Sequence, residues 1–172
     1  MSTSRSQPNI LICGVPGSGK TTLCQKVATE AQLNHVDVNK IAEKYNLYDG
    51  YDEERQCHIL HEDKLLDKLE DTMSSGGNIV DYHGCDFFPE RWFDLVCVLR
   101  VDNTVLYDRL ESRGYSSAKI RENVECEIFG TLAEEARDSY KEDIVRELKS
   151  NVPEDVDNNV CKLLEFMQEW DR

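Results

Sequence analysis

A glycine-rich segment near the N-terminus has the residue types and spacing of a phosphate-binding loop. The stretch Gly14–Thr21 reads Gly-Val-Pro-Gly-Ser-Gly-Lys-Thr, which matches the pattern G-x-x-x-x-G-K-[ST] in full. It follows a short apolar run, Asn9–Cys13, and precedes apolar residues at helical spacing in Lys20–Ala31. A loop of this pattern between a strand and a helix cradles phosphates. The sequence therefore predicts a site for a nucleoside triphosphate.

Each residue type in this loop has a chemical role. Glycines at 14, 17 and 19 permit positive φ angles and let backbone N–H groups approach phosphate oxygens. Lys20 supplies a cation for the β- and γ-phosphates, and the Thr21 hydroxyl supplies a ligand for Mg²⁺. The nucleotide is therefore expected to bind together with Mg²⁺. The predicted contacts come from Gly14, Gly17, Ser18, Gly19, Lys20, Thr21 and Thr22.

An acidic partner for the loop is expected at the end of a neighbouring strand. Asn78–Tyr82 reads as a buried strand, and open parallel sheets place ligands at the carboxyl ends of their strands. Asp81 is therefore predicted to hold Mg²⁺ with Thr21 or to orient the attacking group. His83 is predicted to position a water or to contact a substrate phosphate. The alternatives are a loop-capping aspartate and a histidine without a chemical role.

Arginines concentrate in one part of the chain, since five of the ten lie between residues 91 and 121. Arg109 and Arg113 are four residues apart in a predicted helix, so they project from one face. Their planar, permanently charged groups suit the charge of a transferring phosphoryl group. Both are therefore predicted to act in catalysis. The alternative is a salt-bridged surface with Asp108 and Glu111.

Apolar runs and chain-breaking residues outline the elements that must position these side chains. Strands are expected at residues 9–13, 33–38, 78–82, 95–99 and 144–148, and helices at 20–31, 40–45, 62–73, 104–113, 118–140 and 153–170. Short apolar strands that alternate with helices predict an α/β fold with a parallel sheet covered on both faces. The length of 172 residues predicts a single domain, 1–172.

Composition excludes several classes of protein. The net charge of −14 argues against direct binding to nucleic acid or anionic lipid. No apolar run approaches the roughly 18 residues of a membrane span, and the polar N-terminus lacks a secretory signal. Seven scattered cysteines indicate a reducing compartment, and the group Cys57–His61 fits no standard zinc spacing. A soluble intracellular protein is expected.

Several stretches together resemble the adenylate kinase isoenzyme 6 family of P-loop proteins. The resemblance extends from about Pro8 to Trp170 and includes a segment that ordinary adenylate kinases do not share, Asp81–Trp92. The stretches that carry it are the phosphate loop, Asp49–Glu54, Asp81–Trp92, Leu106–Tyr115 and Cys126–Phe129.

The resemblance implies a nucleoside monophosphate (NMP) kinase fold, with five parallel strands in the order 2-3-1-4-5. It implies an NMP-binding segment near residues 37–60 and a short lid near residues 112–122, with Arg113 contacting the nucleotide at the lid edge. The implied activities are phosphoryl transfer from ATP to AMP and ATP hydrolysis. A short lid shields the site less, so water can compete with AMP as the acceptor.

A cellular role is also implied by the resemblance. Members act in small ribosomal subunit assembly and 18S rRNA maturation, with a basic small-subunit ribosomal protein as partner, in the nucleus and cytoplasm. A monomer is expected. The acidic run Asp49–Glu54 is expected to be a solvated loop, or to meet that basic partner.

The sequence departs from the family pattern at one position of the NMP-binding segment. Glu43 stands where relatives often carry an arginine for the AMP phosphate. A carboxylate repels a phosphate, so Lys40, Lys44 or Arg55 would have to substitute. The alternative function is therefore a nucleotide-switched assembly ATPase that binds a basic ribosomal protein, with weak or incidental AMP kinase activity.

Overall fold

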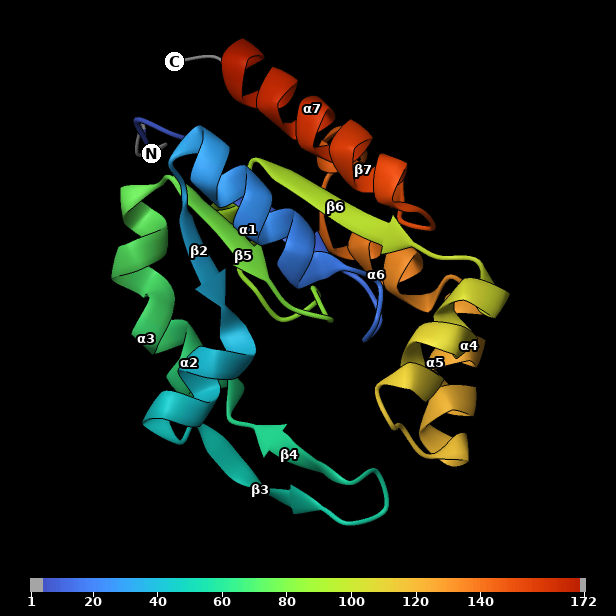
Figure 1. Cartoon of the computed structure of the whole chain (residues 1–172). Coiled ribbons are helices and arrows are strands. Elements are labelled where there is room, and N and C mark those ends of the chain that lie inside the picture. The colour runs from blue at the N-terminus through green and yellow to red at the C-terminus, as the bar shows by residue number, and fades with distance from the viewer. Residues whose placement is uncertain (1–4, 171–172) are drawn as a thin grey trace.

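A five-stranded parallel sheet forms the centre of the computed structural model, which describes residues 5–170 (Figure 1). Its strands are β1 (Ile10–Cys13), β2 (Asn34–Asp37), β5 (Asn78–Asp81), β6 (Leu95–Arg100) and β7 (Val145–Lys149). They lie in the order β2-β5-β1-β6-β7, and every neighbouring pair is parallel. Counted along the sheet strands alone, this is 2-3-1-4-5, so the predicted fold class and strand order are confirmed.

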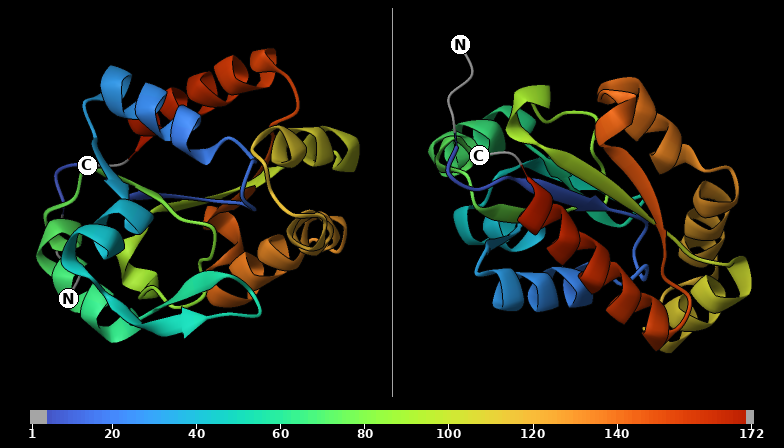
Figure 2. Two further views of the ribbon diagram at one scale, coloured as in Figure 1. Left: turned by 60° about the horizontal axis from the view of Figure 1, so that its bottom comes forward. Right: turned by 90° about the horizontal axis from the view of Figure 1, so that it is seen from above.

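Helices cover both faces of this sheet, as Figure 2 shows from two directions. They are α1 (Lys20–Ala31), α2 (Val38–Tyr45), α3 (Glu62–Ser75), α4 (Asn103–Ser112), α5 (Ser117–Ile128), α6 (Thr131–Ser139) and α7 (Pro153–Glu169), with the short 3₁₀ helices η1 (Glu90–Trp92) and η2 (Glu142–Ile144). No helix within residues 5–170 is long and apolar enough to cross a bilayer.

Alternation along β1 divides the core into two layers. Ile10 and Ile12 face one side, where they pack with residues of α1 and α7. Leu11 and Cys13 face the other side, where they pack with residues of α3 and α6. All four side chains are fully buried, which explains why this strand reads as one continuous apolar run. The loop that follows β1 is therefore fixed by a strand buried on both faces.

The segment predicted as one helix over residues 118–140 is two helices, and this prediction was wrong. Gly130 separates α5 from α6 with a φ of 63°, a left-handed conformation that a helix interior does not contain. Near this corner the buried carboxylate of Glu127 accepts a hydrogen bond of 2.5 Å from Nε of Arg100, which ties the end of α5 to β6.

The acidic run expected as a solvated loop is mostly a strand. β3 (Tyr48–Asp52) and β4 (Cys57–Leu60) form an antiparallel hairpin that projects from the end of α2 (Figure 1). The Asp52 carboxylate accepts hydrogen bonds from the backbone N–H groups of Glu54 and Arg55, which shapes the turn. The Tyr48 and His58 rings stack with centroids 4.4 Å apart. These cross-strand contacts stabilise a hairpin whose strands are largely exposed.

Candidate active site

The glycine-rich loop connects β1 to α1 and requires its glycines for two different reasons. Gly17 and Gly19 have φ angles of 84° and 95°, and Gly19 directly precedes the first residue of α1. Gly14 does not have a positive φ, which corrects the expectation for that residue. A Cβ at Gly14 would lie 2.6 Å from Oγ of Ser18, so here glycine is required by close packing.

Lys20 lies at the start of α1 with its ammonium turned back into the loop. Its Nζ donates hydrogen bonds to the carbonyl oxygens of Gly14 (2.8 Å) and Val15 (3.1 Å). Burial lowers the pKa of Lys20, and the nearby charge of Asp81 partly offsets this effect. A half-buried ammonium held by neutral carbonyls gains considerably from an anionic phosphate.

Thr21 and Asp81 form a direct pair across the loop. The Thr21 hydroxyl donates a hydrogen bond of 2.8 Å to Oδ2 of Asp81, which is 4% exposed at the end of β5. Hydroxyl and carboxylate oxygens are the ligand types that Mg²⁺ prefers, so the donor set fits this ion. The pairing brings together the two residues that were predicted from the sequence to hold Mg²⁺.

His83 lies two residues beyond β5, in the same cleft as Asp81. Although the residue is exposed, the protein atoms around its ring and the charge of Lys20 lower its pKa. The imidazole is therefore mostly neutral near pH 7, and it can accept or donate a hydrogen bond to a water or a phosphate.

These side chains line one cleft of about 380 Å³ between the phosphate loop and α2. The predicted residues that it brings together are Gly17, Gly19, Lys20, Thr21, Thr22, Asp81, His83 and Arg113. Asp37, Asn39, Lys40 and Glu43 form the wall opposite the loop, and Tyr115 lies at the lid edge. The cleft thus joins the phosphate loop to the predicted NMP-binding segment.

Arg109 and Arg113 occupy different positions although both lie at the C-terminal end of α4. The Arg109 guanidinium donates to the carbonyl oxygens of Gly17 and Asn151, both at 3.1 Å, so it joins the phosphate loop to the segment before α7. Arg113 caps the C-terminus of α4, is exposed and lines both the cleft and a neighbouring cavity of about 360 Å³. Only Arg113 therefore borders the main cleft.

Ser18 lies on the buried side of the phosphate loop. It is fully buried, and its carbonyl oxygen accepts a hydrogen bond of 2.5 Å from Oγ of Ser150. Its backbone N–H donates to the carbonyl of Val15 at 3.1 Å, which closes the turn. Ser150 lies beyond β7, and sequence reasoning did not single it out. Like Arg109, it holds the phosphate loop against the segment before α7.

Three cations were expected to replace the arginine that relatives often carry at the position of Glu43. They lie in three different surroundings. Lys40 lines the cleft together with Glu43. The ammonium of Lys44 lies 5.3 Å from the ring centre of Tyr45. Arg55 lies in the turn of the β3–β4 hairpin, where its backbone N–H contacts Asp52. Lys40 is the member of this set that faces the phosphate loop across the cleft.

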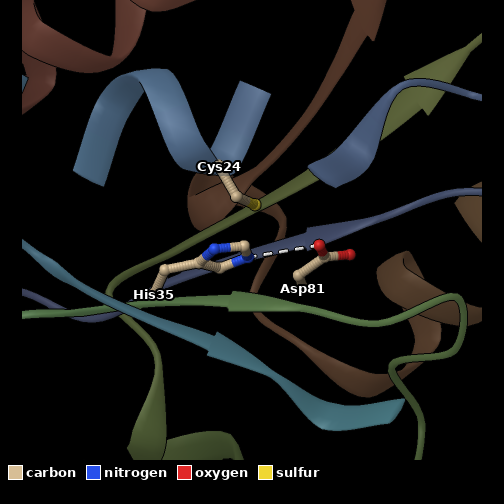
Figure 3. Close-up of side chains that lie close together, drawn as sticks. All are labelled: Cys24, His35 and Asp81. Carbon is tan, nitrogen blue, oxygen red and sulfur yellow. Dashed lines mark hydrogen bonds and ion pairs between the residues drawn. The ribbon is translucent and has the colours of Figure 1, made fainter. Parts of the chain in front are cut away.

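Two residues close to Asp81 were not predicted as site residues from the sequence. Nε2 of His35 in β2 lies 3.3 Å from Oδ2 of Asp81, and Cys24 in α1 lies next to both (Figure 3). The parallel register aligns Asp37 with Asp81, so His35, two residues earlier, lies on the same face of β2 as Asp37. Strand order combined with this two-residue spacing is the signal that could have identified His35.

Comparisons with known proteins agree with this geometry. A family model described as AAA domain matches residues 10–130. Two proteins named adenylate kinase isoenzyme 6 homolog are similar to nearly the whole chain. The one from Caenorhabditis elegans is 54% identical, covering 97% of this chain and 93% of its own, and the one from Dictyostelium discoideum is 50% identical, covering 99% and 97%.

A solved structure shows the same fold at low sequence identity. Shikimate kinase from Acinetobacter baumannii, in complex with shikimate, has a TM-score of 0.66 and is 15% identical, with 95% of this chain and 94% of that chain covered. This likeness shows the fold alone, a parallel sheet with helices on both faces. With its relatives at 50–54% identity over nearly full length, the chain belongs to the adenylate kinase isoenzyme 6 family.

Proposed function

We propose that this protein transfers a phosphoryl group from ATP to AMP, and that it also hydrolyses ATP when water replaces AMP. The observation that carries the proposal is the cleft in which Lys20, Thr21 and Asp81 of the phosphate side face α2. A donor and an acceptor on opposite walls of one cleft can be held in line for direct transfer. The family names of the relatives support the same reaction.

The phosphate loop would bind the donor. The ammonium of Lys20 would exchange its carbonyl contacts for β- and γ-phosphate oxygens, and Thr22 would contact the α-phosphate. Thr21 and Asp81 would hold Mg²⁺, which neutralises developing charge on the phosphates. The neighbouring cavity, bordered by Arg109, Arg113 and the start of α7, is large enough to receive the nucleoside part of the donor.

The opposite wall would bind the acceptor. Lys40 offers a cation to its phosphate, while Glu43 offers a repulsive carboxylate at the same wall. His83 lies at the end of β5 beside Asp81, where it can position an attacking water or contact the acceptor phosphate. Arg113 and Tyr115 at the lid edge border this space. The mixed charge of this wall predicts weak acceptor binding compared with donor binding.

Steady-state rates test this proposal directly. ATP turnover is measured with Mg²⁺ and ATP alone, then with AMP, CMP, GMP or UMP added at equal concentrations. The proposal expects ADP formation to rise when AMP is added, above a slower rate with ATP alone. Equal rates with and without every NMP would mean that the protein hydrolyses ATP but transfers no phosphoryl group to an NMP.

The second candidate is a nucleotide-switched assembly ATPase, and Glu43 is the observation that favours it. In this function, nucleotide occupancy alters the lid, and the lid changes the grip on a basic small-subunit ribosomal protein during 18S rRNA maturation in the nucleus and cytoplasm. The net charge of −14 supports a basic partner. Hydrolysis stimulated by such a protein, with no response to AMP, would favour this candidate over the kinase.

A further inference from the structure

Three side chains with metal-binding atoms converge beside the phosphate loop from three separate elements (Figure 3). Cys24 comes from α1, His35 from β2 and Asp81 from the end of β5. One ligand atom of each residue, namely the Cys24 sulfur, a His35 ring nitrogen and an Asp81 carboxylate oxygen, lies within 4.8 Å of the other two. Ligand atoms around a tetrahedral Zn²⁺ lie roughly 3.2–3.8 Å apart, so small side-chain movements would close this set around an ion.

The types of donor atom select the metal. Mg²⁺ prefers oxygen ligands at all its positions, whereas a set of one sulfur, one imidazole nitrogen and one carboxylate oxygen suits Zn²⁺ or Co²⁺. We propose that Cys24, His35 and Asp81 form a site for Zn²⁺ that is distinct in its donor set from the Mg²⁺ position and shares Asp81 with it. A zinc–sulfur bond forms as the thiol proton leaves to solvent, and no group changes its oxidation state.

Two of the three residues are shielded from solvent. Cys24 is fully buried and Asp81 is 4% exposed, while His35 is half-buried. Asp81 also lines the open cleft, which gives an ion a path from solvent. A water from the cleft would complete the shell of a tetrahedral ion.

Occupation of this site has a consequence for the proposed reaction. Oδ2 of Asp81 accepts the Thr21 hydroxyl at 2.8 Å and lies 3.3 Å from Nε2 of His35. A Zn²⁺ bound to this carboxylate would compete with its pairing to Thr21, so it would inhibit Mg²⁺-dependent turnover. This consequence rests on the proposed function, whereas the metal binding itself does not.

The chain contains a matched control group. Cys57 and His58 in β4 and His61 at the start of α3 also place sulfur and imidazole close together in sequence, but both β4 residues are exposed on the hairpin. If the proposal is correct, substitutions in the hairpin leave metal binding unchanged. Cys57→Ser is therefore the control for Cys24→Ser.

Titration with Co²⁺ in the absence of nucleotide tests the site. Thiolate coordination produces a sulfur-to-cobalt charge-transfer band in the near ultraviolet. The full chain should show this band, the band should disappear in Cys24→Ser and in His35→Phe, and it should persist in Cys57→Ser. Cys24→Ala serves as a second replacement, since alanine suits the interior of α1. Circular dichroism and the thermal midpoint check that each variant is folded.

Other outcomes overturn the proposal. The site is refuted if the full chain shows no band, if the band persists in folded Cys24→Ser or Cys24→Ala, or if it disappears in Cys57→Ser. Inhibition is measured separately: Cys24→Ser should keep its Mg²⁺-dependent ATP turnover but need roughly 10- to 100-fold more Zn²⁺ for half-inhibition. If no variant turns over ATP while the cobalt band behaves as expected, the proposed function fails and the metal site stands.

Discussion

Lys20 is the residue on which donor binding is expected to depend most. Its ammonium contacts two backbone carbonyls in a half-buried position, so a phosphate would provide its first anionic hydrogen-bond partner. Lys20→Ala should lower kcat/KM for ATP turnover by about 100- to 1,000-fold, because one well-placed donor at a developing charge contributes that much. Steady-state rates measure the change, with exposed Lys162→Ala on α7 as the control. Near-normal turnover by a folded Lys20→Ala protein would contradict the assignment of the loop.

Glu43 is the residue at which the two proposed functions diverge. Its carboxylate lines the cleft beside Lys40, opposite the phosphate loop. Glu43→Arg should lower the KM for AMP and raise kcat/KM by roughly five- to hundredfold, since charge reversal in a partly desolvated cleft contributes on the order of 1–3 kcal/mol. ATP hydrolysis without AMP should change little, because Lys20, Thr21 and Asp81 are untouched.

A charge-matched control accompanies this substitution. Glu165→Arg makes the same change in net charge on an exposed position of α7, away from the cleft, and should leave the AMP kinetics unchanged. Unaltered AMP kinetics in Glu43→Arg would mean that this position does not contact the acceptor. A changed rate of ATP hydrolysis would mean that the donor and acceptor walls are assigned incorrectly.

The phosphate side of the site was predictable from a local motif, whereas residues joined to it only by tertiary contacts were not. The loop motif carries a fixed spacing, and Asp81 is marked by its place at the end of an apolar run, so both were found from sequence. His35 and Cys24 carry no local signal, because their proximity to Asp81 depends on which strands are neighbours and on the register between them. Ser150 belongs to a loop far along the chain, and its contact with Ser18 is likewise tertiary.

At the scale of elements, the corner between α5 and α6 depends on Gly130. A Cβ added there would meet the Arg100 guanidinium no closer than 3.5 Å, so space is not limiting and the cost comes from the φ of 63°. Gly130→Ala should therefore reduce the free energy of unfolding by about 1–2 kcal/mol. Urea denaturation measures this change.

Gly50 in β3 is the control for this substitution. An added Cβ there would meet no atom within 4 Å, and its φ is not positive, so Gly50→Ala should change the free energy of unfolding by less than about 0.5 kcal/mol. Equal effects of the two substitutions would show that the left-handed conformation at Gly130 adds no cost when alanine replaces glycine.

The elements that sequence reasoning found are those with a strong apolar pattern. β1, β5 and β6 are almost entirely buried; β1 and β6 read as apolar runs, and β5 has an apolar pair between buried polar ends. The β3–β4 hairpin was missed because its strands are largely exposed and β3 is acidic. Its pairing rests on a turn and on stacked cross-strand rings, which leave no strong apolar pattern. The break at Gly130 was missed because helical apolar spacing continues on both sides of it.

At the scale of the whole molecule, the net charge of −14 should govern association with the proposed basic partner. Charges at the rim of an interface chiefly set the association rate, and salt screens them. Binding to a basic small-subunit ribosomal protein should slow markedly between low and physiological salt, as stopped-flow measurements can determine. A rate that does not respond to salt would contradict the proposed electrostatic attraction.

The hairpin turn provides a local version of this test. Glu53 and Glu54 are exposed there, and neutralising both to glutamine should slow association by roughly two- to fivefold. The same double change at Glu165 and Glu169 on α7 removes equal charge at a distant surface and should have a smaller effect. Asp52 is left intact because its carboxylate shapes the turn.

The products formed from ATP test the central claim of phosphoryl transfer across the cleft most directly. Wild-type protein is incubated with Mg²⁺, ATP and excess AMP, and the ADP and inorganic phosphate released are measured together. Transfer to AMP makes two ADP for each ATP consumed and releases no phosphate, whereas hydrolysis makes one ADP and one phosphate. If transfer occurs across the cleft, ADP should exceed phosphate severalfold when AMP is present and equal it when AMP is omitted. Equal amounts of ADP and phosphate under both conditions would contradict it.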